Sequence, residues 1–301
     1  MNLQFLADGL IMGALIGLGA IGVTLTYSIL RFANFAHGEF VAWGTYLALT
    51  LAGAITMAVG PATTFGNLSF GWPVLVAGAG AAVLTGLLAV ALDALLFSKL
   101  RKHGNAIVMV MASFGASMAL RSLLEFIFTS QPAYFSRDIQ MALPVAFGIR
   151  LTPDQIFLLA ATTVIVIAMD RFMALSAMGR AMRAVSENPA LARVAGVDVD
   201  RVIRATWMIG GALACAAGVM LGITVQIRPF MGFDLLLPLF AAAILGGIGS
   251  ITGAVAGGLI VGVSEAAAVQ IVGSDYRAAI AFLILIAVLL VKPTGLFGVR
   301  E

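Results

Sequence analysis

The segment from Asn34 to Glu39 places side chains that can bind a polar ligand or a proton beside long apolar stretches. It reads Asn-Phe-Ala-His-Gly-Glu. Such groups are costly at membrane depth, and ionisable residues found there are candidates for function. A polar loop just outside the bilayer is the alternative reading of the same pattern. We mark Asn34, His37, Gly38 and Glu39 as candidate site residues.

Three more charged residues lie inside apolar stretches. Arg121 and Glu125 are four positions apart, the spacing at which side chains on one helix face can pair. We therefore predict an Arg121–Glu125 ion pair. Glu265 has no evident partner in its own stretch. It is expected to face a pore, with a bond to a neighbouring helix as the alternative.

An enzyme is not favoured by this sequence. His37, Glu39 and Ser113 are the residues from which a site could be built, but no nucleophile–base or metal-ligand spacing joins them. We expect no catalytic residue and no metal site. The phosphate-binding pattern Gly-x-x-x-x-Gly-Lys-[Ser/Thr] is also missing from the sequence. Energy from ATP would therefore have to come through a partner.

The longest polar stretch, residues 179–200, predicts a short folded hairpin. Asn188 is a good N-cap, Pro189 suits the first helical position, and Gly196 can supply a left-handed stop. Small apolar residues lie between arginines, and an apolar face rimmed by charge marks a contact site for another protein. The candidate contact residues are Glu187, Asn188, Pro189, Ala190, Leu191, Arg193, Val194 and Gly196.

Composition defines the elements that must position these groups. Apolar residues make up 61% of 301 positions and charged residues only 10%, against about 25% charged in a soluble domain. Lipid must therefore cover most of the surface. The net charge of +3 does not indicate nucleic-acid binding, because the charges fall between apolar stretches and form no basic stripe.

Apolar stretches of about 20 residues predict eight or nine transmembrane helices. The stretch Leu235–Leu245 is too short to cross unless it extends or is broken. Lys and Arg concentrate in loops 99–103 and 171–204 and after residue 291, which predicts that these segments are cytoplasmic. The predicted spans are Phe5–Leu30, Phe40–Val59, Pro73–Phe97, Ala106–Phe128, Gln155–Met169, Ile203–Ile227, Leu235–Leu245, Ile251–Val272 and Arg277–Val291.

Glycines recur every four residues in two of these regions. This spacing gives a helix a flat face and lets a neighbour approach closely. We expect packing within the chain rather than a dimer contact. The candidate packing residues are Gly9, Gly13, Gly17, Gly249, Gly253 and Gly257, with Gly258 and Gly262 adding a second register.

Four motifs together carry a family resemblance that spans nearly the whole chain. They are residues 34–39, residues 179–202, the run Ala243-Ile-Leu-Gly-Gly-Ile-Gly-Ser-Ile-Thr-Gly-Ala254, and the ending Lys292-Pro-Thr-Gly-Leu-Phe-Gly298. In this combination and order the chain resembles the permease family of branched-chain amino acid ABC importers, most closely the first of their two paired permeases. One departure is that Glu187 is followed by Asn188 instead of the Ala-Ala found in the broader ABC-importer signature.

The resemblance implies an all-α integral membrane protein of about eight to nine transmembrane helices, with residues 1–301 forming one permease domain. It also implies a cytoplasmic coupling helix within 179–200 and a location in a bacterial inner membrane. The implied partners are a second homologous permease (in a heterodimer or homodimer), two ATP-binding cassette subunits and a periplasmic substrate-binding protein. ATP and Mg would bind to those ATPases, leaving no cofactor in this chain.

We therefore take Asn34, His37, Gly38, Glu39 and Glu265 as the candidates for the translocation pathway. Branched-chain or related amino acids are the expected cargo, with urea, amides or aromatic acids as alternatives within the same class of permease. An ion-coupled secondary transporter is a less favoured alternative, because only Glu265 and His37 would serve ion coupling.

Overall fold

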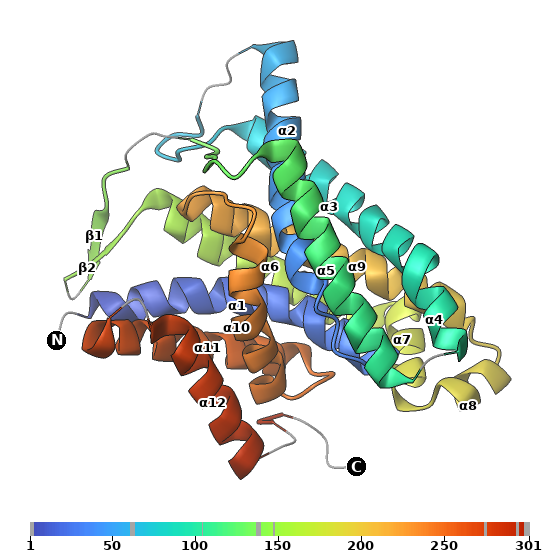
Figure 1. The fold of residues 1–301 in the computed structure, drawn as a ribbon. Coiled ribbons are helices and arrows are strands. Elements are labelled where there is room, and N and C mark those ends of the chain that lie inside the picture. The colour runs from blue at the N-terminus through green and yellow to red at the C-terminus, as the bar shows by residue number, and fades with distance from the viewer. Residues whose placement is uncertain are drawn as a thin grey trace.

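The computed structural model describes residues 3–60, 64–103, 105–136, 140–146, 148–273, 276–292 and 295–297 (Figure 1). Helices account for most of the described chain, and a two-stranded antiparallel hairpin is the exception. The elements are α1 (Gln4–Leu30), α2 (His37–Val59), α3 (Trp72–Leu92), a π-helical turn (Asp93–Phe97), α4 (Ser98–His103), α5 (Ala106–Phe128), β1 (Leu143–Ala146), β2 (Ile149–Leu151), α6 (Pro153–Leu175), α7 (Ala177–Glu187), α8 (Pro189–Val194), α9 (Val199–Thr224), α10 (Met231–Gly246), α11 (Ile251–Val272) and α12 (Arg277–Val291).

Each predicted span corresponds to a helix, so the all-α polytopic membrane fold is confirmed. In the described residues, 7 helices are long and apolar enough to cross a membrane, and α10 and α12 are shorter apolar helices. The ranges predicted for α5, α11 and α12 match their helices. The stretch at Leu235–Leu245 extends to Met231 and Gly246, and it contains Pro238 within the helix.

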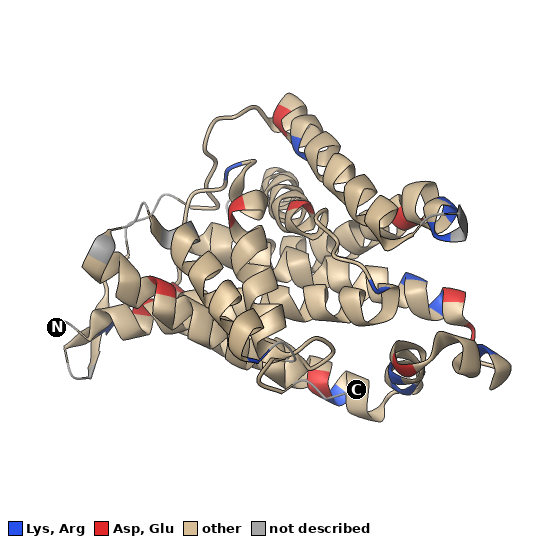
Figure 2. Cartoon of the chain, turned by 60° about the horizontal axis from the view of Figure 1, so that its bottom comes forward, with Lys and Arg blue, Asp and Glu red and all other residues tan. Residues whose placement is uncertain are grey.

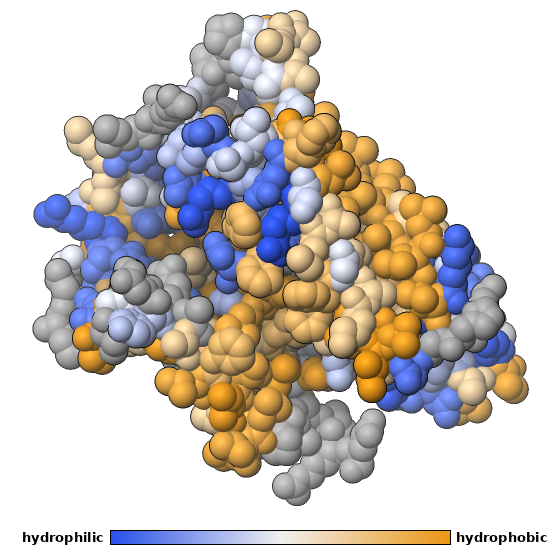
Figure 3. Space-filling model, viewed as in Figure 1, coloured by the Kyte–Doolittle hydropathy of each residue, from blue (hydrophilic) through white to orange (hydrophobic). Residues whose placement is uncertain are grey.

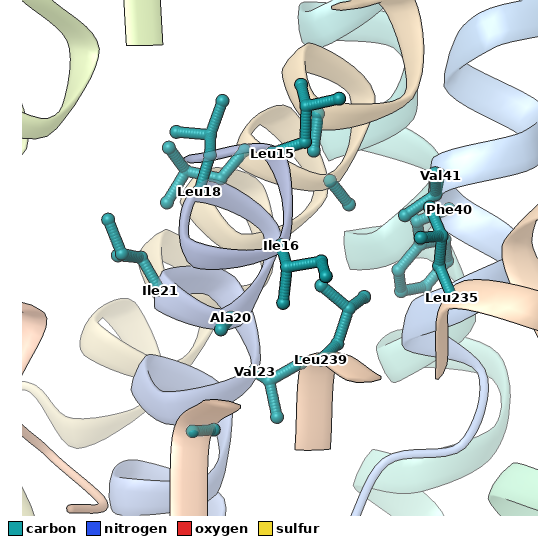
Figure 4. Packing of buried hydrophobic residues seen from close by; sticks show 14 of the residues in the cluster. Leu15, Ile16, Leu18, Ala20, Ile21, Val23, Phe40, Val41, Leu235 and Leu239 are labelled. Carbon is teal, nitrogen blue, oxygen red and sulfur yellow. The ribbon is translucent and has the colours of Figure 1, made fainter. Parts of the chain in front are cut away.

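The helix α1 forms the centre of the bundle, because 89% of its most apolar window is buried. It lies against α9, α10 and α11, which all come from the last third of the chain. Figure 4 shows Ile16 and Val23 of α1 close to Leu239 of α10, while Phe40 of α2 lies near Leu235. A helix enclosed on all sides has no need of an amphipathic pattern, which explains why α1 is apolar around its whole circumference.

Glycines bring α1 and α11 into backbone contact. A Cβ atom added to Gly13 would lie 2.7 Å from Leu259 Cα, and one added to Gly258 would lie 2.4 Å from Gly17 Cα. The glycine pattern therefore serves packing within the chain. Only a side group as small as hydrogen fits at these positions.

The second predicted glycine ladder is corrected by the structure. Gly249 lies in the turn before α11, with a φ of 92°, and is not part of a packed helix face. Gly253 and Gly257 face α10, where added Cβ atoms would meet Gly246 and Ala242. The register that faces α1 is Gly258 and Gly262. A helix with small residues on two faces can pack closely against two neighbours. Spacing alone does not show which face meets which neighbour.

Different loops lie at the two ends of the molecule. At one end Gln4 exchanges hydrogen bonds with the backbone of Arg150. At the other end Arg31 donates to the carbonyl oxygens of Ser186 and Glu187. Figure 2 shows most Lys and Arg at the end far from the N-terminus. In Figure 3 a broad apolar surface over α5 and α12 separates polar regions near the β-hairpin and near α4, α7 and α8.

Candidate functional site

The segment that links α1 to α2 folds back beside α1. His37 Nε2 lies 3.3 Å from the carbonyl oxygen of Gly19, and a Cβ on Gly22 would lie 2.6 Å from the His37 ring. Gly22 precedes Arg31, at the end of α1, by nine residues, which is about 13 Å along a helix. Asn34, His37 and Glu39 are all at least 97% buried. The solvated-loop alternative is therefore wrong, and these groups lie inside the protein.

Asn34 and Gly38 shape this re-entrant segment. Asn34 Oδ1 accepts a hydrogen bond from Ala36 N, and its carbonyl oxygen accepts one from His37 N. Gly38 crosses Gly232 of α10, where an added Cβ would lie 2.5 Å from the Gly232 carbonyl oxygen. The backbones of the first turns of α2 and α10 therefore lie in direct contact at Gly38 and Gly232. Any larger residue at Gly38 would push the two helices apart.

Glu39 forms a buried ion pair with Arg121 of α5. Its Oε1 lies 2.7 Å from Arg121 Nη2 and 3.2 Å from Nε, and it also accepts a hydrogen bond from Ser117 Oγ at 3.0 Å. The predicted Arg121–Glu125 pair is wrong. The spacing rule sees only neighbours within one helix, whereas packing brings a buried carboxylate from α2 to the same guanidinium.

Two aromatic rings from the start of α10 complete the surroundings of Arg121. Its guanidinium carbon lies 4.2 Å from the centre of the Phe233 ring and 5.1 Å from that of Phe230. A cation over an aromatic face is attracted by the ring quadrupole. The cluster Glu39, Ser117, Arg121, Phe230 and Phe233 thus joins α2, α5 and α10. Sequence analysis missed Ser117 and both rings, because a polar or aromatic residue in a span carries no signal of its partner.

More polar contacts fix α5 along α2. Ser113 Oγ accepts a hydrogen bond from Phe35 N, and Trp43 Nε1 donates to the Leu120 carbonyl oxygen. Ser113 therefore has a positioning role in the fold. The described residues contain no group of three or more His, Cys, Asp or Glu side chains that could hold a metal ion.

Glu265 is buried on α11 but is not part of this cluster. Ala266 lies next to Gly9 of α1, whereas His37 lies at the level of Gly19 and Gly22. Ten or more residues along α1 correspond to roughly 15 Å or more. The structure therefore does not bring Glu265 together with the Asn34–Glu39 segment.

The hairpin between α6 and α9 contains the predicted short helix, α8. Asn188 Oδ1 accepts hydrogen bonds from the N–H groups of Ala190 and Leu191, and Gly196 has a φ of 87°. The side chains of Leu191 and Val194 are 66% and 86% exposed. Pro189, Ala190 and Arg193 are exposed as well, as is Glu187 at the end of α7.

Ala192 anchors α8 to the rest of the protein. It is 4% exposed and belongs to a small apolar cluster with Met182 and Val185 of α7 and Val199 and Val202 of α9. The helix is therefore fixed on one side and presents Leu191 and Val194 on the other. Asp198 caps α9 by accepting a hydrogen bond from Arg201 N.

The C-terminal motif contacts the glycine-rich motif at the end of α10. Leu296 N donates to the Leu245 carbonyl oxygen, and Phe297 N donates to that of Gly246. In the adjoining turn, Gly249 N donates to Thr24 Oγ1 of α1. Two motifs that are separate in the sequence thus form one contact region.

These features define a multi-pass membrane protein with a buried polar cluster in the bundle and a capped helix outside it. The family described as "Branched-chain amino acid transport system / permease component" matches residues 5–289. The chain belongs to this family, which is a permease family rather than a catalytic one.

Curated relatives cover nearly the full chain. It is 34% identical over 305 residues to the "High-affinity branched-chain amino acid transport system permease protein LivH" of Escherichia coli (strain K12), covering 99% of this chain and 96% of the relative. It is also 34% identical to BraD of Pseudomonas aeruginosa, with the same coverage. A probable LivH of Methanocaldococcus jannaschii is 30% identical, covering 98% of this chain and 92% of the relative.

One solved structure aligns with the chain over most of its length. It is a chain of PsaBC from Streptococcus pneumoniae in complex with Fab, aligned over 97% of this chain and 95% of that chain. The sequence identity is 14% and the TM-score is 0.47.

Proposed function

We propose that this chain is the channel-forming subunit of an ATP-driven importer in a bacterial inner membrane, and that it moves branched-chain or related amino acids. Family membership and the names of the curated relatives support this cargo. The whole chain, residues 1–301, would act as one permease domain. Urea, amides and aromatic acids remain the alternative cargoes, and the ligand of the cognate binding protein, measured by calorimetry, separates them.

The proposed complex contains a second homologous permease, as a heterodimer or homodimer. Two ATP-binding cassette subunits would bind ATP and Mg²⁺ and hydrolyse the nucleotide, and a periplasmic protein would deliver substrate. The missing phosphate-binding pattern supports a division of labour in which this chain supplies the channel and its partners supply energy.

The helix α8 is the observation that carries the proposed coupling. Coupling between subunits requires an element that moves as a unit and makes different contacts in two states. A helix with a side-chain cap at Asn188, a left-handed stop at Gly196 and an anchor at Ala192 meets the first condition. Its exposed residues Leu191 and Val194 supply an apolar face that an ATPase groove can enclose.

Leu191→Asp tests this role. Because Leu191 is exposed in the isolated chain, the substitution should leave its folding intact. In the complex it would bury an unpaired charge, which costs several kcal/mol. We expect co-purification of the ATPase to fall at least tenfold and ATP-dependent uptake to be lost. The matched control is Val145→Asp, because Val145 is 57% exposed on the hairpin at the other end.

Wild-type ATPase binding and uptake in Leu191→Asp would show that α8 is only a surface loop. Uptake by the isolated chain in liposomes without ATP would instead favour the ion-coupled transporter. A complex that binds the ATPase but imports none of the proposed solutes would contradict the assigned cargo while leaving the assembly intact.

We further propose that Asn34, His37, Gly38 and Glu39 line the translocation pathway, with Glu265 at a separate level. Support comes from Asn34 Nδ2 and His37 Nδ1, buried atoms with no hydrogen-bond partner among the described residues. Buried polar atoms in proteins are nearly always paired, so an exception calls for an explanation. Asn34→Ala and His37→Ala should each lower uptake at normal membrane levels. Unchanged uptake in both would make the segment a simple connection.

A further inference from the structure

The ion pair between Glu39 and Arg121 is unusually one-sided. All three of its donors, two from Arg121 and one from Ser117, reach the same oxygen, Oε1. Glu39 Oε2 is buried and accepts no hydrogen bond from the described residues. Arg–carboxylate pairs frequently use both oxygens in two parallel hydrogen bonds. The buried pair therefore leaves one negatively charged acceptor available for another donor.

The other side of Arg121 opens toward the surface of the chain. The side chain of Arg121 is 14% exposed, whereas that of Glu39 is 1% exposed. Phe230 and Phe233, over which the guanidinium lies, are 48% and 43% exposed. From the surface inward, the order is therefore apolar rings, a cation with five N–H donors, and a carboxylate with a spare oxygen.

We propose that Glu39, Arg121, Phe230 and Phe233 form a transient binding station for a zwitterionic α-amino acid with an apolar side chain. This inference rests on the proposed function and names the chemistry of its pathway. The ammonium group donates to Glu39 Oε2, and the carboxylate accepts hydrogen bonds from Arg121. The apolar side chain of the ligand covers the exposed faces of the two rings.

Charge pairing selects a zwitterion over the alternative cargoes. An anion such as an aromatic acid would draw on Arg121 and leave the Glu39 carboxylate buried with a weakened partner, which is strongly unfavourable. A cation would pair with Glu39 and leave the Arg121 guanidinium with a weakened partner. A neutral amide or urea would gain no charge-assisted hydrogen bond at both ends. Only a ligand with both charges keeps every buried charge paired.

The same arrangement keeps the station weak, as a transport path requires. Without ligand, Glu39 and Arg121 neutralise each other, so a departing amino acid leaves no unpaired charge behind. Binding that is favourable enough for entry and weak enough for release is the general condition for conduction. Selection among zwitterionic amino acids can then remain with the binding protein.

Neutralising both partners tests the station without leaving a buried charge. Glu39→Gln/Arg121→Gln leaves no charge at either position, and neutral replacement of a buried ion pair is often tolerated. We expect ATP-dependent uptake of radiolabelled L-leucine by the complete transporter to fall at least tenfold. Membrane level and ATPase co-purification should stay within twofold. Loss of charge-assisted hydrogen bonds accounts for a change of this size.

The matched control neutralises a second ion pair of the same chemistry, Asp93 with Arg101, whose atoms lie 2.8 Å apart. Asp93→Asn/Arg101→Gln should retain L-leucine uptake within about threefold. Uptake near the wild-type level in the Glu39/Arg121 double variant would overturn the station. An equal loss in both double variants would also overturn it, because neutralising any such pair would then suffice.

A thiol-labelling measurement keeps the inference testable if the double variant fails to fold. In a chain carrying Cys215→Ala, we compare Phe233→Cys with Met118→Cys, because Met118 is a 56% exposed position on α5. A charged methanethiosulfonate reagent should modify position 233 at least tenfold faster than position 118. L-leucine with its binding protein and ATP should slow the reaction at 233 several-fold.

Equal, slow modification at both positions would place the two rings against lipid and overturn the station. The outcomes for station and transporter are distinguishable. If the wild-type complex shows no ATP-dependent uptake, the proposed function fails. The contrast between positions 233 and 118 still decides whether the station faces water.

Discussion

The helices α1 and α11 touch through backbone at glycines, whereas α2 and α5 touch through polar side chains. On the first pair, Gly13 and Gly258 approach the opposite backbone so closely that no Cβ fits. On the second pair, Trp43 Nε1 donates to the Leu120 carbonyl oxygen, Glu39 pairs with Arg121, and the Tyr46 and Phe128 rings pack with their centroids 4.7 Å apart. Just before α2, Phe35 N donates to Ser113 Oγ.

This difference indicates which contact can change during a transport cycle. Close packing of small residues falls off steeply with distance and offers no second arrangement of similar energy. Hydrogen bonds and ion pairs can instead exchange partners with water or a ligand. We therefore expect α1 and α11 to move as one body and α5 to be the helix that can separate from α2.

The largest effect is expected from Gly13→Leu. Its Cβ would lie 2.7 Å from Leu259 Cα and 2.8 Å from the Gly258 carbonyl oxygen. Backbone atoms cannot move aside as the end of a flexible side chain can. We therefore expect the free energy of unfolding to fall by about 3 kcal/mol or more. The unfolding midpoint in detergent should fall accordingly. The control is Gly115→Leu on α5, where nothing lies within 4 Å of an added Cβ. Similar midpoints in both variants would contradict the rigid contact.

An effect of similar size is expected from Glu39→Ala. It leaves the Arg121 guanidinium in a largely buried site without its carboxylate, which typically costs about 3–5 kcal/mol. Glu39→Gln retains a hydrogen-bond acceptor and should cost less. Proteolysis in the loops that flank α5 reports its separation from α2. Greater protection in Glu39→Ala than in the wild-type protein would refute the role of the ion pair.

The smallest effect is expected from Trp43→Phe. The substitution keeps most of the aromatic surface and removes one hydrogen bond, from Nε1 to the Leu120 carbonyl oxygen. A single such bond contributes about 1 kcal/mol. Trp72→Phe, at the start of α3, is the matched control. A change at Trp43 as large as that of Glu39→Ala would mean that the ring, not the hydrogen bond, holds α5.

Sequence alone predicted features that depend on local rules. Spans, caps and stops follow from the solvation and hydrogen bonding of a helix, so α5, α11 and the ends of α8 were placed correctly. The partner of Arg121 was predicted wrongly, because Glu125 is close in the sequence whereas Glu39 is brought to Arg121 only by helix packing. For the same reason, spacing did not show that Gly258 and Gly262 face α1 while Gly253 and Gly257 face α10.

The burial of residues 34–39 is a feature of the candidate site that the sequence could not predict. Their polarity marked them as unusual, but the same sequence is also compatible with a solvated loop. Only the contacts of His37 with Gly19 and Gly22 fix them inside the bundle. The rings of Phe230 and Phe233 could not be chosen from 19 phenylalanines in an apolar sequence.

The central position of α1 also sets the order in which the protein can be made. This helix leaves the ribosome well before its neighbours α9, α10 and α11, which come much later in the chain. At about 5–20 residues per second, more than 200 residues correspond to a delay on the order of ten seconds to a minute. During that interval the insertion machinery or lipid must shield the glycine face of α1. Assembly of the core therefore follows synthesis of the chain, and a ribosome that stalls before α11 leaves α1 without its closest partner.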